Sequence, residues 1–206
     1  TKGKDIAVLL NNAGALINPR EETAVGLEKR FALLLLSPYV LTERLHPLLA
    51  KAASQRGAAR VVNVLSGGMY TQKIQVNDLQ SKQGTYSGSV AYARAKRGLM
   101  ILTEDWARRW ASDGIVVNAM HPGWADTPGV LAALPAFHRV TERVLRTPEE
   151  GADTIVWLAA ATEAGKVSGQ FWLDRRPHAK HVLPGTRETP AERRELLKAL
   201  AAFGRH

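Results

Sequence analysis

The chain has no cysteine among its 206 residues. Disulfide bonds and thiolate metal sites are therefore excluded, and cysteine usage says nothing about the redox compartment. The six histidines are scattered. The nearest pair, His178 and His181, has no third ligand beside it, so we expect both at the surface and no metal site. Aromatic residues make up only 6% of the sequence and do not alternate with basic ones, which argues against a nucleic-acid surface built on stacking.

Long apolar runs are also lacking. The run over residues 31–36, for example, is far shorter than the roughly 20 residues that a membrane-spanning helix needs. The first residues have neither an initiator methionine nor the pattern of a signal peptide. We therefore expect no transmembrane segment, a cytoplasmic location by default, and a chain that lacks a preceding segment.

The remaining composition is that of an ordinary globular protein, with 45% hydrophobic and 23% charged residues. The net charge is +9, and arginine and lysine are concentrated after residue 173. A basic face can attract an anionic partner, but a solvated face explains it equally well, and we expect no nucleic-acid partner. We predict one domain over residues 1–206, with residues 174–206 as a basic C-terminal extension that ends in an amphipathic helix over 190–203.

Apolar runs and helical periodicity alternate along the chain. Continuous apolar runs are typical of strands buried on both faces of a parallel sheet, and they occupy residues 6–10, 60–65, 115–120 and, more briefly, 171–173. Helical patterns cover residues 21–51 (with Pro38 as a break), 89–111, 130–134, 147–161 and 190–203, while residues 69–88 form a long loop with one turn at 76–79. This alternation predicts an α/β fold, a doubly wound parallel sheet with helices on both faces.

Small and polar residues follow three of the expected strands directly, at positions 11–14, 66–68 and 121–129. In open parallel sheets, ligands bind beyond the carboxyl ends of the strands. A simple turn would explain each cluster alone. Their common location favours a ligand site at that edge.

Tyr92 and Lys96 are four residues apart in the expected helix over 89–111, so both lie on one helix face. A phenol has a pKa of about 10, and a nearby ammonium group lowers it. Such a tyrosine can give a proton to a carbonyl oxygen or take one from an alcohol. Many helices carry this pair by chance, but this helix lies between the second and third polar clusters, which favours the catalytic interpretation.

These motifs together resemble the short-chain dehydrogenase/reductase superfamily: Asn11-Asn12-Ala13-Gly14, Ser66, Tyr92-x-x-x-Lys96 and Pro122-Gly123-x-x-x-Thr127-Pro128. The 26 residues from Ser66 to Tyr92 are similar to the spacing in the retinol-dehydrogenase-like branch. The resemblance implies a Rossmann-like fold whose N-terminal strand–helix units are absent here. It also implies NAD or NADP as cofactor and hydride transfer to or from a small carbonyl or alcohol substrate, expected to be lipophilic because of apolar residues such as Met69.

The resemblance also implies residue roles. Tyr92 would be the general acid/base, Lys96 would lower its pKa and bind the nicotinamide ribose, and Ser66 would hold the substrate oxygen. Asn118 would be structural, and a homo-oligomer through the Tyr92 helix is possible. Cofactor contacts would come from Asn11, Ala13, Gly14, Tyr92, Lys96, Pro122, Gly123 and Thr127, although the amide of Asn11 could instead tie neighbouring strands together.

Two departures from the family pattern matter. The glycine-rich turn Gly-x-x-x-Gly-x-Gly, which binds the pyrophosphate, is absent from the sequence. Leu34 occupies the position of an asparagine that usually completes a proton relay. Three interpretations therefore stay open: an oxidoreductase (favoured as the family function), a truncated or degenerate member without turnover, and a basic binding module. We also expect an exposed sheet edge at the first strand.

Overall fold

A computed structural model describes residues 5–15, 19–123 and 146–204. Within this part of the chain, the strands form one sheet in the order β1-β2-β3-β4-β5. Neighbouring strands from β1 to β4 are parallel, and β5 pairs antiparallel with β4. Their bounds are β1 Val8–Asn11, β2 Ala59–Val64, β3 Ile115–Met120, β4 Phe171–Leu173 and β5 Arg176–His178. The predicted α/β fold with a parallel sheet is confirmed.

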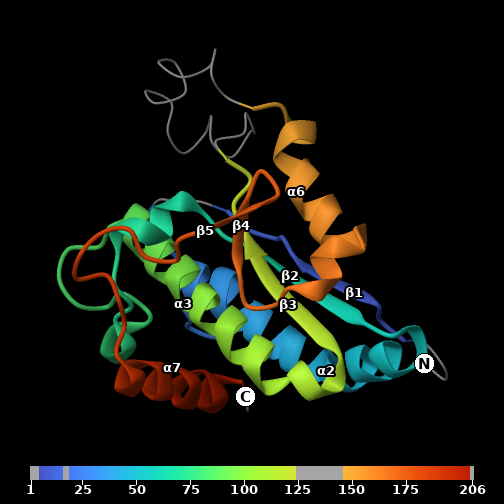
Figure 1. The fold of residues 1–206 in the computed structure, drawn as a ribbon. Coiled ribbons are helices and arrows are strands. Elements are labelled where there is room, and N and C mark those ends of the chain that lie inside the picture. The colour runs from blue at the N-terminus through green and yellow to red at the C-terminus, as the bar shows by residue number, and fades with distance from the viewer. Residues whose placement is uncertain (1–4, 16–18, 124–145, 205–206) are drawn as a thin grey trace.

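Helices cover both faces of the sheet (Figure 1). On one face lie α2 (Ser37–Arg56) and α3 (Gly88–Arg109), and they enclose the larger hydrophobic core with residues such as Leu49, Val61 and Trp106. On the other face, α6 (Pro148–Ala160) packs its Leu158 against Val62 of β2. The sheet is therefore doubly covered at its centre, as predicted.

The first strand is less buried than its apolar sequence predicted. Val8 and Leu10 are 38% and 44% exposed, because β1 is the edge strand among the described residues and α6 packs mainly on β2 and β3. The expectation of burial on both faces was therefore wrong for β1. The exposed sheet edge that we predicted is present here.

The helix predicted from residue 21 begins only at residue 29. An antiparallel bridge between Glu22 and Glu28, closed by a turn in which Gly26 has φ 75°, holds the preceding residues in a hairpin-like loop. A short helix α1 (Lys29–Phe31) then leads through the π-helical turn η1 (Ala32–Leu36) into α2. Pro38 lies in the first turn of α2, where proline is tolerated, so it does not break the helix.

The helix that carries Tyr92 begins at Gly88, one residue before the predicted start, and has Ser87 as its N-cap. The Ser87 hydroxyl accepts a hydrogen bond from the backbone N–H of Val90. Before it, the loop contains two 3₁₀ turns, η2 (Gly67–Thr71) and η3 (Val76–Asp78), and the second confirms the predicted turn. After α3, the 3₁₀ turn η4 (Ala111–Asp113) ends at Gly114 with φ 71°, a conformation that favours glycine.

The C-terminal segment joins the sheet and the core. Asp174 and Arg175, both with positive φ, form a two-residue hairpin loop into β5, a strand that the polar sequence Arg-Pro-His did not reveal. The 3₁₀ turn η5 (Glu163–Lys166) precedes β4. As predicted, α7 spans Pro190–Phe203, and its Leu196 and Leu200 enter the larger core.

Two further expectations concern single segments. His178 is exposed, as predicted, but the His181 side chain is only 15% exposed, so its assignment to the surface was wrong. It is covered because the chain after β5 packs against α3 and α7. The short helix expected over residues 130–134 lies outside the described residues. No helix in the described part of the chain is long and apolar enough to cross a membrane.

Candidate active site

Three elements bring the predicted catalytic residues together at the carboxyl edge of the sheet. Ser66 follows β2, and Tyr92 and Lys96 lie on the first turns of α3. The Lys96 Nζ atom lies 5.7 Å from the centroid of the Tyr92 ring, and the Ser66 and Tyr92 side chains share a hydrogen bond. A Cβ atom placed on Gly14, after β1, would lie 3.7 Å from the same Nζ. The motifs that the sequence separates by up to 82 positions thus form one site.

Ser66 is held by the turn that follows it. Its hydroxyl oxygen accepts a hydrogen bond of 3.2 Å from the backbone N–H of Gly68, and its carbonyl accepts one of 3.1 Å from Met69. Burial raises the pKa of the Tyr92 phenol, while its hydrogen bond with Ser66 acts in the opposite direction. Burial outweighs the effect of Ser66, so the pKa of Tyr92 is raised and not lowered as the sequence predicted, and the phenol is protonated at neutral pH.

Lys96 is 3% exposed, and its Nζ donates a hydrogen bond of 2.7 Å to the carbonyl oxygen of Val64. Burial lowers the pKa of Lys96 to about 8. A Cβ on Gly14 would lie 3.1 Å from the Cδ2 atom of Leu34, so Leu34 is part of the apolar wall close to the ammonium group. A leucine side chain makes no hydrogen bond, so it cannot take part in the relay role of the usual asparagine.

Asn11 lies at the edge of the site, but its amide binds other parts of the protein. Its Nδ2 donates to the Thr42 hydroxyl at 2.9 Å and to the Asn63 side-chain oxygen at 2.7 Å. Asn63 in turn donates to Thr103 of α3 at 2.8 Å. This buried chain of hydrogen bonds ties β1, α2, β2 and α3 together, the alternative role considered for Asn11. Its contact with a cofactor stays a prediction.

The third polar cluster follows β3. Arg146 donates to the Pro122 carbonyl at 3.4 Å and forms two hydrogen bonds with the carboxylate of Asp174, one of them 2.8 Å long. A Cβ on Gly123 would lie 2.6 Å from the Nε atom of Arg146, so a larger residue would have to displace that side chain, and it would be strained by the φ of 80°. Thr127 lies outside the described residues. Sequence reasoning missed Arg146, since only the fold brings it to this loop.

His121 is a second residue of this edge that the sequence analysis did not select. A Cβ on Gly67, next to Ser66, would lie 3.2 Å from the His121 Nε2 atom. Burial, assisted by the charge of Arg146, lowers the pKa of His121 to about 4, so its ring is neutral at neutral pH. Its place directly before Pro122 and Gly123, at the end of a buried strand, is the signal that could have found it.

Asn118 has the structural role that we expected. Its side-chain nitrogen donates to the Val167 carbonyl at 2.6 Å. Its side-chain oxygen accepts hydrogen bonds from the backbone of Gln170 and the indole of Trp172. These bonds fix the chain that leads into β4.

The residues at this edge fit the nicotinamide end of NAD or NADP. Ala13 and Gly14 expose backbone without a large side chain, and Lys96 places an ammonium group beside them. The sequence contains no glycine-rich turn that would bind the pyrophosphate. In the residues that the structure describes, no three His, Asp or Glu side chains are grouped as metal ligands.

Comparison with known proteins identifies the family. The family model described as enoyl-(acyl carrier protein) reductase matches residues 2–173. The chain belongs to the short-chain dehydrogenase/reductase superfamily. It is 45% identical over 195 residues to human dehydrogenase/reductase SDR family member 12, covering 94% of the chain and 60% of that protein. It is 34% identical over 176 residues to mouse retinol dehydrogenase 14, covering 81% of the chain and 50% of that protein.

A solved structure extends the comparison. A 2-deoxy-D-gluconate 3-dehydrogenase homologue from Agrobacterium tumefaciens, described with bound NADP, has a TM-score of 0.57 and 28% identity, with 80% of this chain and 64% of that chain covered. The chain spans about half to three fifths of the length of the two curated relatives. The family and fold predicted from the motifs are confirmed.

Proposed function

We propose that the protein is an NAD- or NADP-dependent oxidoreductase that transfers a hydride between the nicotinamide ring and a small carbonyl or alcohol. The observation that carries the proposal is the convergence of Ser66, Tyr92 and Lys96 at the carboxyl edge of the sheet. Membership of a family of oxidoreductases and the NADP in the Agrobacterium structure support the same chemistry. The cofactor, when bound, supplies or accepts the hydride.

In the reductive direction, the protonated Tyr92 phenol donates its proton to the carbonyl oxygen of the substrate. The Ser66 hydroxyl donates a hydrogen bond to the same oxygen and stabilises the negative charge that develops there. In the oxidative direction, Tyr92 must act as a phenolate, and the nearby Lys96 ammonium favours that form. The Ser66 and Tyr92 side chains share a hydrogen bond, so both hydroxyl groups are close enough to bind the same substrate oxygen.

The proposed cofactor contacts come from both ends of the site. Lys96 binds the nicotinamide ribose, while the exposed backbone at Ala13 and Gly14 lines one side. Pro122 and Gly123, directly after β3, approach the nicotinamide. Thr127, which lies outside the described residues, is proposed as a further cofactor contact. Asn11 contributes by holding the end of β1 in place.

The proposed substrate is lipophilic, and its support is the name of retinol dehydrogenase 14 among the relatives. Met69 gives no support, because it is fully buried in the core rather than open to a substrate. The other apolar residues behind this expectation lie outside the described residues: Trp124, Val130, Leu131, Leu134 and Phe137.

A family member without turnover is the second candidate, favoured by Leu34 in place of the relay asparagine. Titration of the purified 206-residue chain with NADPH and NADH, followed by cofactor fluorescence, separates the two. Saturable binding that is weakened in Lys96→Ala supports the oxidoreductase. Absence of binding to a chain whose circular dichroism shows it folded contradicts it and favours the second candidate. Binding of heparin that salt abolishes would instead support a basic binding module.

A further inference from the structure

The turn that holds Ser66 is attached to the C-terminal segment. The Tyr70 hydroxyl donates a hydrogen bond of 2.5 Å to the carbonyl oxygen of Ala179. The guanidinium of Arg97 donates to the Met69 carbonyl at 2.9 Å with Nη2 and to the Lys180 carbonyl at 2.7 Å with Nη1. One side chain of α3 therefore bridges η2 and the residues that follow β5.

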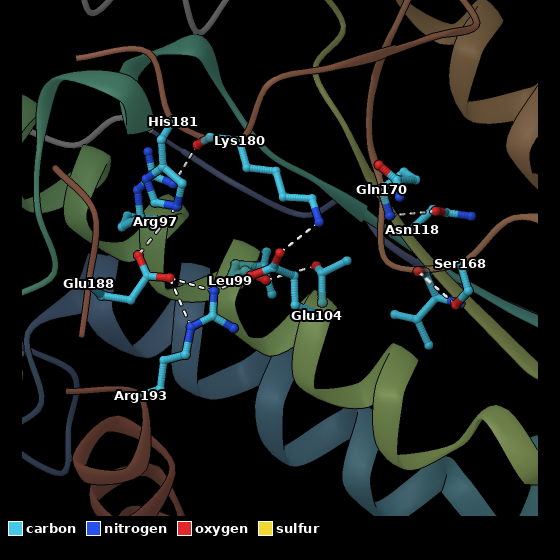
Figure 2. Close-up of polar contacts among 12 residues, drawn as sticks. Arg97, Leu99, Glu104, Asn118, Ser168, Gln170, Lys180, His181, Glu188 and Arg193 are labelled. Carbon is cyan, nitrogen blue, oxygen red and sulfur yellow. Dashed lines mark hydrogen bonds and ion pairs between the residues drawn. The ribbon is translucent and has the colours of Figure 1, made fainter. Parts of the chain in front are cut away.

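Arg97 is fully buried. The C-terminal segment around it is held by ion pairs of its own, which Figure 2 shows between α3, the segment after β5 and α7. Glu104 binds the Lys180 ammonium at 2.7 Å and also Arg193. Glu188 binds Arg193 at 2.9 Å, and its other oxygen lies 3.7 Å from His181. The Lys180 carbonyl is thus a fixed acceptor, and Arg97 connects it to the Ser66 turn.

Displacement of Met69 would be passed on to Ser66 through a short path. The Met69 N–H donates to the Ser66 carbonyl, and the Gly68 N–H donates to the Ser66 hydroxyl. Both donors belong to the 3₁₀ turn η2, and the Met69 side chain of this turn is fully buried. A shift of the Met69 carbonyl therefore changes the direction of the Ser66 hydroxyl.

We propose that Arg97 is a positioning residue that sets the Ser66 hydroxyl by fixing its turn to the C-terminal segment. The consecutive residues Lys96 and Arg97 then have separate tasks: Lys96 binds the carbonyl of Val64 before Ser66, and Arg97 binds that of Met69 after it. The part of this inference that concerns turnover rests on the proposed oxidoreductase function. The bridge between the two segments does not.

Hydrogen–deuterium exchange of the 206-residue chain tests the bridge without any need for activity. In Arg97→Met, we expect the amides of residues 67–71 and 179–181 to exchange at least about tenfold faster, while β2 and β3 keep their protection. The matched control is Arg108→Met, which removes an exposed arginine from the same helix and should leave both segments unchanged.

Unchanged exchange in both segments of Arg97→Met would overturn the proposal. Faster exchange throughout the sheet would overturn it as well, because Arg97 would then be a general core stabiliser. If Arg97→Met does not fold, Arg97→Lys serves instead, since a single ammonium group cannot hold both carbonyls as the planar guanidinium does. Faster exchange in at least one of the two segments is expected there, and protection equal to wild type in both would overturn the proposal.

A double-mutant cycle with NADPH and nonanal as probes tests the effect on turnover. We expect kcat to fall about 100-fold in Ser66→Ala and about tenfold in Arg97→Met, with the NADPH dissociation constant within about twofold of wild type. Because Arg97 acts through Ser66, the double variant should lose no more than Ser66→Ala alone. Losses that multiply would show that Arg97 does not act through Ser66. Failure of the wild type to bind NADPH would contradict the proposed function, while the exchange experiment would still decide on the bridge.

Discussion

The Lys96 ammonium group donates a hydrogen bond of 2.7 Å to the carbonyl oxygen of Val64, the last residue of β2. This bond anchors the lysine to the same strand end that carries Ser66, so the two residues keep a fixed separation. It also holds a positive charge in a place that is 3% exposed, where burial lowers the pKa to about 8. The arrangement therefore has a measurable cost to folding that depends on pH.

Lys96 should make the stability of the protein rise with pH in the alkaline range. Between pH about 8 and its ordinary pKa of 10.5, the folded protein binds fewer protons at Lys96 than the unfolded chain. Stability from this group therefore increases through that window, by about 3 kcal/mol in total. Urea unfolding at pH 7.5, 9 and 10.5 should show wild type gaining this amount relative to Lys96→Met. Parallel pH profiles of the two proteins would contradict the assignment.

His121 should have a corresponding effect in acid. Its pKa is about 4 in the folded protein and 6.5 ordinarily, so the unfolded chain binds more protons between these values. The free energy of unfolding should therefore fall as pH is lowered from 6.5 to 4. In His121→Gln that part of the decline should disappear, while His178→Gln, which changes an exposed histidine, should keep it. Thermal unfolding at pH 6.5, 5 and 4 measures the difference; an equal decline in all three proteins is the contrary result.

Tyr92→Phe should remove turnover without removing the cofactor. The phenol acts in proton transfer, which general acid–base catalysis speeds by about 100- to 10,000-fold, so kcat should fall by that factor. The ring and its packing remain, so the dissociation constant of NADPH should change less than about threefold. Stopped-flow binding and steady-state rates with a carbonyl probe give the two quantities. A variant that turns over at the wild-type rate would exclude Tyr92 as the acid/base.

The strands and helices with strong local signals were predictable from sequence. The apolar run of β3 and the Thr-Pro-x-Glu caps of α6 and α7 specify their elements through residues adjacent in the sequence. The predicted bounds of these three elements agree with the structure within about a residue. The π-helical start before α2 and the strand β5 were not predictable in this way, because each depends on contacts with distant parts of the chain.

The same distinction between local signals and distant contacts applies to the candidate site. Ser66, Tyr92 and Lys96 could be predicted to meet because the carboxyl ends of parallel strands share one edge. The roles of Arg97 and His121 could not, since nothing near them in sequence shows that Met69, Lys180 or Gly67 will lie beside them. The upward pKa shift of Tyr92 is likewise a consequence of burial, which only the packed structure fixes.

Replacement of Asn11 tests whether its side chain stabilises the fold or binds the cofactor. Its Nδ2 is the donor for both Thr42 and Asn63, so Asn11→Ala leaves two buried acceptors without a hydrogen bond. Each such acceptor costs about 1–3 kcal/mol, so the free energy of unfolding should fall by about 2–6 kcal/mol. Asn12→Ala, at the exposed next position, should change it by less than about 0.5 kcal/mol. Urea denaturation measures both, and a fall in NADPH affinity without a fall in stability in Asn11→Ala would instead make Asn11 a cofactor contact.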